Sequence, residues 1–284
     1  MPAPIRDAST VLPLRDSPAG LEVFMVRRSA RLGFLGGAHV FPGGAVDPED
    51  RAEAVRRYLQ GFEAAAACRT LRTDDELRVR GHYVAAFREL FEEAGVLLAV
   101  SSTGELCGAG EQARLSVDRI LLARGRRAFV DVLEGLGLRL SADRLLYFAH
   151  WITPASSPKR FDTRFFVAIM PPGQSAQHDR AESADGEWVS PRDGLARYAR
   201  GEVEMVVPTI CALDRLTLHD TAADALRACR ELDVVDVVPK VATANDRVAI
   251  FYPGDAEYGP AGGISEPGRL LSRQVLKGGR WQKP

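Results

Sequence analysis

Three glutamates, Glu89, Glu92 and Glu93, follow Arg88 within one short segment, and they are the strongest candidates for chemistry in the chain. On a helix they would span about 100° of arc. The opposite side of that helix would carry an apolar stripe of Val84, Phe87, Leu90, Phe91 and Ala94. Carboxylates crowded on one face repel one another. The cluster is therefore either a solvated helix face that Arg88 partly compensates or a site that holds something positive.

The order of the residues favours the second interpretation. The segment from Arg88 to Val96 reads R-E-U-x-E-E-x-G-U, where U is Ile, Leu or Val. A chance match to this string anywhere in such a chain has odds on the order of one in ten thousand. The string resembles the C-terminal half of the Nudix box. The resemblance implies a mixed α/β protein with a Nudix-type α/β/α sandwich, and a hydrolase that cleaves a diphosphate linkage.

Divalent cations explain why such a pattern is useful. Mg²⁺ prefers oxygen ligands and bridges carboxylates to substrate phosphates. By resemblance, Glu92 and Glu93 are metal ligands, Glu89 is a ligand or the base for the attacking water, and Arg88 orients Glu89. The implied cofactor is Mg²⁺ or Mn²⁺.

The N-terminal half of the box departs from the pattern. Family members carry Gly, five residues, Glu, seven residues and then Arg, whereas 43 residues separate Gly44 from Arg88 here. We therefore expect an insertion over about residues 50–80, which is rich in Ala, Arg and Glu, looks helical and has little to mark it as core. The acid expected eight positions before Arg88 is Arg80, which cannot ligate a cation. We expect the helix to pack on the Gly43-Gly44 turn, with Gly43 offering a backbone carbonyl to the metal.

Upstream of the box, Arg28-Ser29 and the stretch Gly37–Gly44, which contains Phe41-Pro42-Gly43-Gly44, resemble a motif of coenzyme A diphosphatases. Together with the interrupted box and residues 151–154 and 159–163, this looks like the peroxisomal-type branch of that family. The resemblance implies that Arg28, Phe41 and Gly44 contact substrate. Phe-Pro-Gly-Gly is also a common tight turn, since glycine tolerates positive φ.

Other polar and aromatic residues have two interpretations each. Arg160 and Arg164 flank an expected strand and are candidates for gripping phosphates, or else are surface arginines. Trp151 either stacks on adenine or is buried in the core. Glu182 is a candidate for an additional ligand or base, although acids in a polar loop are usually solvated.

The expected elements alternate without βαβ regularity. We expect a hairpin over residues 10–26 and a strand over 38–41. The helical period runs over residues 83–98, and Gly95 is the expected end of the helix. A second helix is expected over 117–136, strands over 145–152, 164–170 and 186–189, and helices over 208–218 and 222–232. Residues 8–232 would form the Nudix domain, and residues 233–284 a C-terminal extension packed on it.

Composition narrows the class of protein. The 284 residues carry a net charge of −1, which argues against a nucleic-acid or polybasic membrane binder. The four cysteines are far apart, with no C-x-x-C pair, and no stretch reads as a signal peptide or membrane span. We expect a cytoplasmic enzyme that acts on a small nucleotide, with a homodimer left open.

The expected reaction is hydrolysis of coenzyme A or acyl-coenzyme A to 3′,5′-ADP and (acyl-)phosphopantetheine. ADP-ribose, NADH and dinucleoside polyphosphates remain alternative substrates, because the catalytic helix does not distinguish them. A catalytically silent Nudix-fold module that binds a nucleotide is the alternative from another class.

Overall fold

The computed structural model describes residues 3–30, 35–179, 183–244, 247–253, 255, 258 and 274–283. Its central sheet is built from β1 (Ile5–Ser17), β2 (Gly20–Arg28), β3 (Ala38–Val40), β4 (Gly43–Ala45), β8 (Leu146–Ile152), β9 (Arg160–Ile169), β10 (Ser183–Val189), β11 (Glu204–Met205) and β12 (Asp236–Val237). The order is β11-β3-β2-β1-β9-β8-β12, with β4 paired to β1 and β10 to β2. The sheet is mixed, because β1 runs parallel to β9 and antiparallel to β2. The hairpin expected over residues 10–26 is confirmed, and its strands extend beyond that range at both ends.

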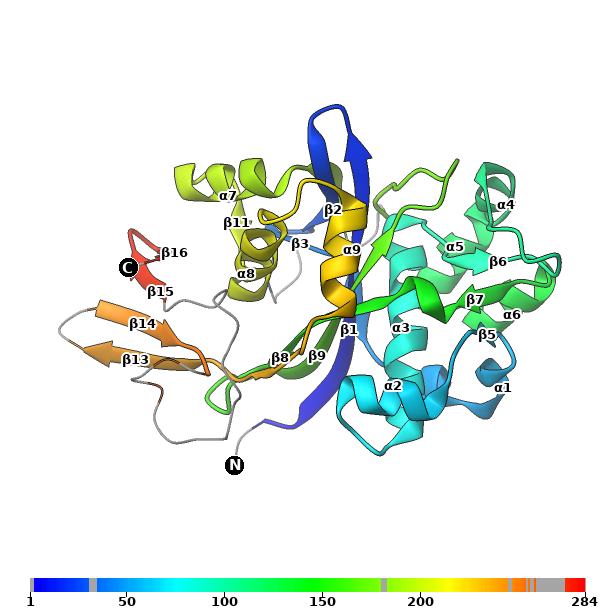
Figure 1. The fold of residues 1–284 in the computed structure, drawn as a ribbon, viewed down its shortest axis with the longest axis horizontal. Coiled ribbons are helices and arrows are strands. Elements are labelled where there is room, and N and C mark those ends of the chain that lie inside the picture. Colours follow the sequence, from blue (N-terminus) through cyan, green and yellow to red (C-terminus); the bar gives the residue numbers. More distant parts are fainter. Residues whose placement is uncertain are drawn as a thin grey trace.

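Helices cover both faces of this sheet (Figure 1). Side chains of a strand alternate between faces, so Val11 belongs to one core cluster and Leu12 and Leu14 to another. The first cluster packs under α2 (Ala64–Leu71) and α3 (Glu76–Ala94). The second packs under α7 (Pro191–Arg200), α8 (Val207–Leu216) and α9 (Ala222–Arg230). The result is three layers, with α3 on one face of β1 and α9 on the other.

The helix that carries the glutamates is longer than the sequence pattern indicated. It begins at Glu76, where the Asp75 side chain accepts a hydrogen bond from the Arg78 backbone N–H at 2.9 Å. It ends at Gly95, as expected, with φ +69° and the Gly95 N–H bonded to the Phe91 carbonyl. Residues 76–80 fall in the segment that looks helical from the sequence, but their continuity with the glutamate helix was not expected, because they carry arginines rather than a clear apolar stripe.

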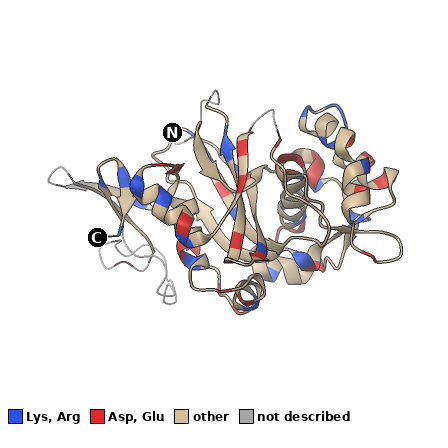
Figure 2. Ribbon diagram, turned by 90° about the horizontal axis from the view of Figure 1, so that it is seen from above, with Lys and Arg blue, Asp and Glu red and all other residues tan. Residues whose placement is uncertain are grey.

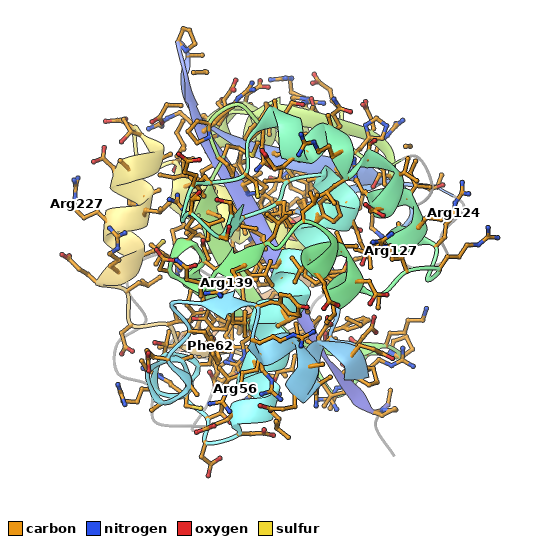
Figure 3. All side chains as sticks on the ribbon, turned by 90° about the vertical axis from the view of Figure 1, so that its right-hand side faces the viewer. Arg56, Phe62, Arg124, Arg127, Arg139 and Arg227 are labelled. Atoms are coloured by element: carbon orange, nitrogen blue, oxygen red, sulfur yellow. The ribbon has the colours of Figure 1, made fainter. Side chains whose placement is uncertain are left out.

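Residues 48–71 form short elements rather than one helical run. They are a 3₁₀ turn (Pro48–Arg51), α1 (Glu53–Arg56), β5 (Leu59–Gln60) and α2. β5 joins β6 (Ala99–Val100) and β7 (Arg139–Ser141) in a small second sheet. The expectation that this segment has little to do with the core is wrong, because Val55, Tyr58 and Leu71 are buried in the cluster around α3. Phe62, which Figure 3 labels on this side of the molecule, packs against Tyr83 with ring centroids 5.4 Å apart.

The expected helix over residues 117–136 is two helices. They are α5 (Ser116–Ala123) and α6 (Phe129–Gly135), preceded by α4 (Ala109–Arg114). The break includes Gly125, whose φ of +62° no continuous helix allows. Arg124, at this break, points outward at one edge of Figure 3, and Arg227 of α9 points outward at the other.

Downstream of α9 the chain adds a sheet that packs on the α7–α9 layer. Its strands are β13 (Lys240–Ala244), β14 (Arg247–Phe251), β15 (Gln274–Lys277) and β16 (Arg280–Gln282). Tyr252 and Ile250 are buried in the same cluster as α8. The Trp281 backbone N–H donates to the Tyr198 hydroxyl of α7 at 2.7 Å. A 3₁₀ turn (Ala142–Arg144) completes the described elements.

Basic and acidic residues are mixed along most elements (Figure 2), in keeping with the near-zero net charge. No helix among the described residues is both long and apolar enough to cross a membrane.

Candidate active site

A cavity of about 690 Å³ lies where the C-terminal half of α3 meets β4 and the start of β1. At one end it is lined by Glu89, Glu92, Glu93, Arg28 and Asp179. Its other end is lined by apolar side chains from β8, β9, the start of α8 and the C-terminal strands. We call this space the active-site cavity.

Arg88 connects the glutamates to the rest of the fold. It is buried, and its Nη1 donates to Glu89 Oε1 at 2.8 Å and to Glu92 Oε1 at 3.1 Å. Its Nε and Nη2 donate to the two carboxylate oxygens of Asp50 at 3.0 and 2.8 Å, and Nη2 also reaches the Ala45 carbonyl. Because the guanidinium is planar and donates in several directions, it holds the carboxylate of Asp50 in a fixed position relative to those of Glu89 and Glu92. The expected role of Arg88 in orienting Glu89 agrees with this geometry.

The two glycines of β4 leave room for the carboxylates. The Gly43 N–H donates to Glu93 Oε2 at 2.9 Å. A Cβ at Gly44 would lie 2.4 Å from Glu89 Oε1, and one at Gly43 would lie 2.5 Å from the Ser9 carbonyl oxygen. Any larger residue at either position would therefore have to displace its neighbours. The structure shows the N–H of Gly43 engaged with Glu93, while its proposed carbonyl contact to a metal remains a prediction.

The electrostatics of this end of the cavity call for additional positive charge. Burial raises the pKa of Glu89 to about 7, with Glu92 adding to the shift and Arg88 opposing it. Burial also raises the pKa of Glu92, and it raises that of Glu93 well above its usual range, to which nearby Glu89 contributes. Arg88 and Arg28 together thus compensate too little charge for the carboxylates gathered here.

These residues fit a hard divalent cation. The donors at this end of the cavity are carboxylate oxygens from one rigid helix, with no sulfur or imidazole among the described residues that line it. Mg²⁺ and Mn²⁺ favour such oxygen sets. The identity of the ion stays a prediction.

A second group of possible ligands lies on the other side of β1. Asp7, His82 and Asp162 place ligand atoms within 4.8 Å of one another. Arg78 already donates to both carboxylates, at 2.6 Å to Asp7 Oδ1 and 2.8 Å to Asp162 Oδ2. Because the guanidinium supplies the positive charge there, the group is explained as an ion-pair network that joins β1, α3 and β9.

Asp50 is a site residue that sequence reasoning missed. It follows Gly44 with five residues between them, which is the family's spacing, and it carries Asp in place of Glu. It is buried at 2% exposure, and its carboxylate bridges Arg88. The expectation that Arg80 occupies the acid's place is wrong. Arg80 instead donates to Glu53 at 2.9 Å and to the Arg51 carbonyl.

The substrate-binding candidates divide into two groups. Arg28, Phe41 and Gly44 line the active-site cavity, and the Nε of Arg28 is buried without a hydrogen-bond partner among the described residues. Arg160 and Arg164 do not line it.

The expectation that these two arginines grip substrate phosphates is not supported, because they lie on the other face of β9. Phe161, Thr163 and Phe165 alternate with them and face the cavity. Arg164 is buried and donates to the Tyr147 hydroxyl at 2.8 Å and to the Leu71 carbonyl at 3.2 Å. Arg160 donates to the Thr153 carbonyl at 3.2 Å.

The expected extra carboxylate, Glu182, lies outside the described residues. A nearby acid, Asp179, does line the cavity, and its backbone N–H donates to the Glu93 carbonyl at 3.1 Å. Trp151 also lines the cavity, but it is only 6% exposed and packs edge-on against Tyr252. The expectation of burial for Trp151 is therefore confirmed.

Comparison with known proteins agrees with this geometry. The family model of the NUDT19 Nudix domain matches residues 70–216. Acyl-coenzyme A diphosphatase NUDT19 of Gallus gallus is 30% identical, and the alignment covers 89% of this chain and 79% of that protein. The Homo sapiens protein of the same name is 27% identical, and that alignment covers 89% of this chain and 76% of the human protein. The crystal structure of a NUDIX hydrolase from Alicyclobacillus acidocaldarius superimposes with a TM-score of 0.63 at 32% identity, covering 79% of this chain and 96% of that one. With its glutamate helix, glycine turn and Arg88 network in place, the chain belongs to the NUDT19 Nudix domain family.

Proposed function

We propose that this protein is a metal-dependent hydrolase of the diphosphate linkage of coenzyme A or acyl-coenzyme A, giving 3′,5′-ADP and (acyl-)phosphopantetheine. The observation that carries the proposal is one cavity with Glu89, Glu92 and Glu93 at one end and an apolar surface at the other. The relatives named acyl-coenzyme A diphosphatase, which cover most of the chain, support the same substrate class.

Each residue at the charged end has a task in this reaction. Glu89, Glu92 and Glu93 would hold Mg²⁺ or Mn²⁺, and the bound ion would supply the positive charge that a diphosphate needs in the transition state. Arg88, fixed by Asp50, restrains Glu89 and Glu92 so that their oxygens do not reorient during the reaction. Arg28, which lines the same end of the cavity, offers a guanidinium to the phosphates. Glu89 is the proposed acceptor of the proton from the attacking water.

The two halves of the Nudix box lie far apart in the sequence but meet in the folded chain. We propose that the segment of about residues 50–80 is an insertion within the box, since Asp50 and Arg88 remain in contact across it. We propose residues 8–232 as the Nudix domain and 233–284 as a C-terminal extension. A cytoplasmic location and a homodimer belong to the same proposal.

Product analysis tests the function. The protein would be incubated with coenzyme A, acetyl-coenzyme A, ADP-ribose and NADH, with Mg²⁺, Mn²⁺ or chelator, and the products identified by chromatography and mass. We expect metal-dependent release of 3′,5′-ADP from the coenzyme A species. Turnover of ADP-ribose or NADH alone would support metal-dependent hydrolysis of a diphosphate linkage but would reject coenzyme A and acyl-coenzyme A as the substrates.

The silent binding module loses its main support in this structure. Loss of the acid at the position of Arg80 would favour such a module, but Asp50 supplies that acid instead. A metal-dependent melting shift without turnover of any of the four substrates would restore it.

A further inference from the structure

The active-site cavity changes character along its length. Beyond the glutamates, most of the lining is aromatic, aliphatic or proline, and the hydroxyl groups of a few threonines and Ser157 lie among these side chains. The apolar residues include Trp151, Phe161, Val207, Pro208, Val241 and Ile250. Among the described lining residues, Arg6 and Arg28 are the cations. Arg28 belongs to the charged end, whereas Arg6 of β1 is paired with Phe161 of β9 and lies beside the apolar end. Apart from Arg6, this end favours the uncharged part of a ligand.

Part of this apolar wall comes from outside the stretch that matches the family model. Pro239, Val241 and Ile250 lie beyond residue 216, on or next to the β13–β14 hairpin. Ile250 is 5% exposed and is fixed in the core, whereas Val241 is 55% exposed although it lines the cavity. Val241 is thus a wall residue whose side chain can change without disturbing packing.

The back of this end is rigid. Trp151 packs edge-on against Tyr252, with ring centroids 5.9 Å apart and an interplanar angle of 88°. The Tyr252 hydroxyl in turn donates to Gln274 Oε1 at 3.0 Å. A pocket with such a fixed apolar back binds by excluding water from a preformed surface.

We propose that the apolar end of the cavity, closed by the β13–β14 hairpin, binds the acyl end of acyl-coenzyme A, and that Val241 is a specificity-determining residue for the acyl chain. The proposal rests on the proposed function. The two ends of the substrate differ in charge, since the nucleotide end carries a 3′-phosphate and the pantetheine-acyl end is neutral. Only the neutral end suits a surface of this composition.

The size of the cavity agrees with such a ligand. About 690 Å³ lies within the range of roughly 300–1,000 Å³ that small-molecule sites occupy. Each methylene transferred from water to an apolar wall gains enough free energy for about a fourfold increase in kcat/KM. The wild-type protein should therefore favour longer acyl chains until the apolar end is full, and free coenzyme A should be a poorer substrate.

The experiment compares an acyl series in three proteins. The kcat/KM is measured for coenzyme A and for its acetyl, butanoyl, hexanoyl and octanoyl thioesters in wild type, Val241→Asp and Leu218→Asp. Leu218 is 61% exposed and lies between α8 and α9, away from the cavity, so it is the matched control. We expect Val241→Asp to flatten the increase with chain length, so that the ratio of kcat/KM for the octanoyl thioester to kcat/KM for free coenzyme A falls toward one. Leu218→Asp should follow wild type.

Calorimetric binding with chelator present gives a readout that does not depend on turnover. Octanoyl-coenzyme A should bind wild type more tightly than coenzyme A does, and this difference should shrink about tenfold in Val241→Asp. An equal slope in all three proteins would overturn the proposal, as would equal weakening of coenzyme A and 3′,5′-ADP in Val241→Asp, which would place the nucleotide at this end. Absence of hydrolysis of every coenzyme A species, with the chain-length effect on binding intact, would reject the proposed function alone.

Discussion

At the scale of single residues, Asp50 has the most informative role, because it fixes the arginine that fixes the glutamates. Asp50→Asn removes one charge partner of buried Arg88, which keeps Glu89 and Glu92. Asn has one oxygen to accept from the guanidinium where Asp has two, and losing a hydrogen bond between charged groups costs about 2 kcal/mol in free energy of unfolding. A loosened Arg88 no longer restrains Glu89. We expect lower stability in urea and a lower kcat with KM little changed.

Two variants test whether this effect belongs to the ion pair. Asp47 also approaches Arg88, at 3.6 Å, but its side chain is 56% exposed, so Asp47→Asn should cost little. Asp50→Glu keeps the charge and carries the family's usual residue, and it should recover most of the kcat. A folded Asp50→Asn protein with wild-type kcat would show that Arg88 needs no such support.

Glu89→Gln tests the proposed proton acceptor. Loss of a general base typically lowers kcat by about 10²–10⁴-fold. Because Gln has nearly the same shape and keeps the hydrogen bond from Arg88, we expect the melting temperature to stay near that of wild type. Glu76→Gln, in the exposed first turn of the same helix, is the control. Wild-type kcat in Glu89→Gln would assign the base to another carboxylate, with Asp179 the next to test.

At the scale of elements, strand β4 and helix α3 lie close together because β4 carries glycines, Gly43 and Gly44, where it meets the glutamates of α3. In Gly44→Ala the new Cβ would lie 2.4 Å from Glu89 Oε1, the end of a side chain that can move. A displacement of about 1 Å in a catalytic group can cost on the order of 10²-fold in rate. We therefore expect Gly44→Ala to lose kcat while keeping most of its stability, as measured by steady-state kinetics and thermal melting.

Gly43→Ala should behave differently from its neighbour. There the Cβ would meet backbone atoms, the Ser9 carbonyl oxygen at 2.5 Å and Thr10 Cα at 2.7 Å, which cannot move without disturbing β1. This variant should lose stability first. Gly110→Ala, in open space on α4, should leave kcat unchanged and should not lower stability, since alanine favours a helix more than glycine does. Equal stability losses at Gly43 and Gly44 would contradict the distinction.

Local signals explain which elements could be predicted from the sequence. The end of α3 follows from Gly95, and the glutamate face follows from helical spacing. The start of α3 depends on ion pairs to distant residues, such as Arg78 to Asp7, which no local pattern reveals. Likewise, counting forward from Gly44 with the family's five-residue gap reaches Asp50. Counting back from Arg88 reaches the wrong residue, because the segment between Asp50 and Arg88 is longer than in the family.

The misassigned arginines show a second limit of the sequence. Arg164 has the residue type that binds phosphates, but its function depends on which face of β9 it occupies. Phe161, Thr163 and Phe165 alternate with it, so the strand period contained a signal for the two faces. The cavity itself was beyond prediction, because the β13–β14 hairpin and α8 meet it only in the folded chain.

At the scale of the whole molecule, a buried charge network joins helix α3 to the central sheet. His82 of α3 lies against the Asp7 end of β1, with its Nδ1 3.2 Å from the Ala8 carbonyl oxygen and 3.2 Å from Ser9 Oγ. Asp162 of β9 contacts His150 of β8 at 2.6 Å, and His150 contacts Asp236 of β12 at 2.7 Å. The network thus links α3 to four strands of the central sheet.

This network predicts how stability depends on pH. Burial lowers the pKa of His82 from 6.5 to about 4; Arg164 of β9 and Arg78 of α3 favour the neutral form, whereas Asp7 and Asp162 oppose the shift. Below pH 6.5 the unfolded chain binds a proton at this position that the folded chain does not. The contribution of His82 to the free energy of unfolding therefore falls by about 3 kcal/mol as the pH drops from 6.5 to about 4, at 1.36 kcal/mol per pH unit.

Urea titrations of wild type and His82→Gln between pH 7.5 and 4 measure this contribution. Gln offers hydrogen bonds to Ser9 and the Ala8 carbonyl but does not titrate, so the difference in stability between the proteins should shrink or reverse as the pH falls. His39 and His219, whose pKa values burial also lowers, contribute equally to both proteins and cancel. Parallel stability curves over this range would show that His82 takes up its proton in the folded state as readily as in the unfolded chain. Glu89, Glu92 and Glu93, whose pKa values burial raises, bind protons in the folded state over the same pH range and act in the opposite direction, but they are present in both proteins and cancel in the same way. Asp7 and Asp162 have lowered pKa values, so their stabilising contribution is lost only at more acidic pH.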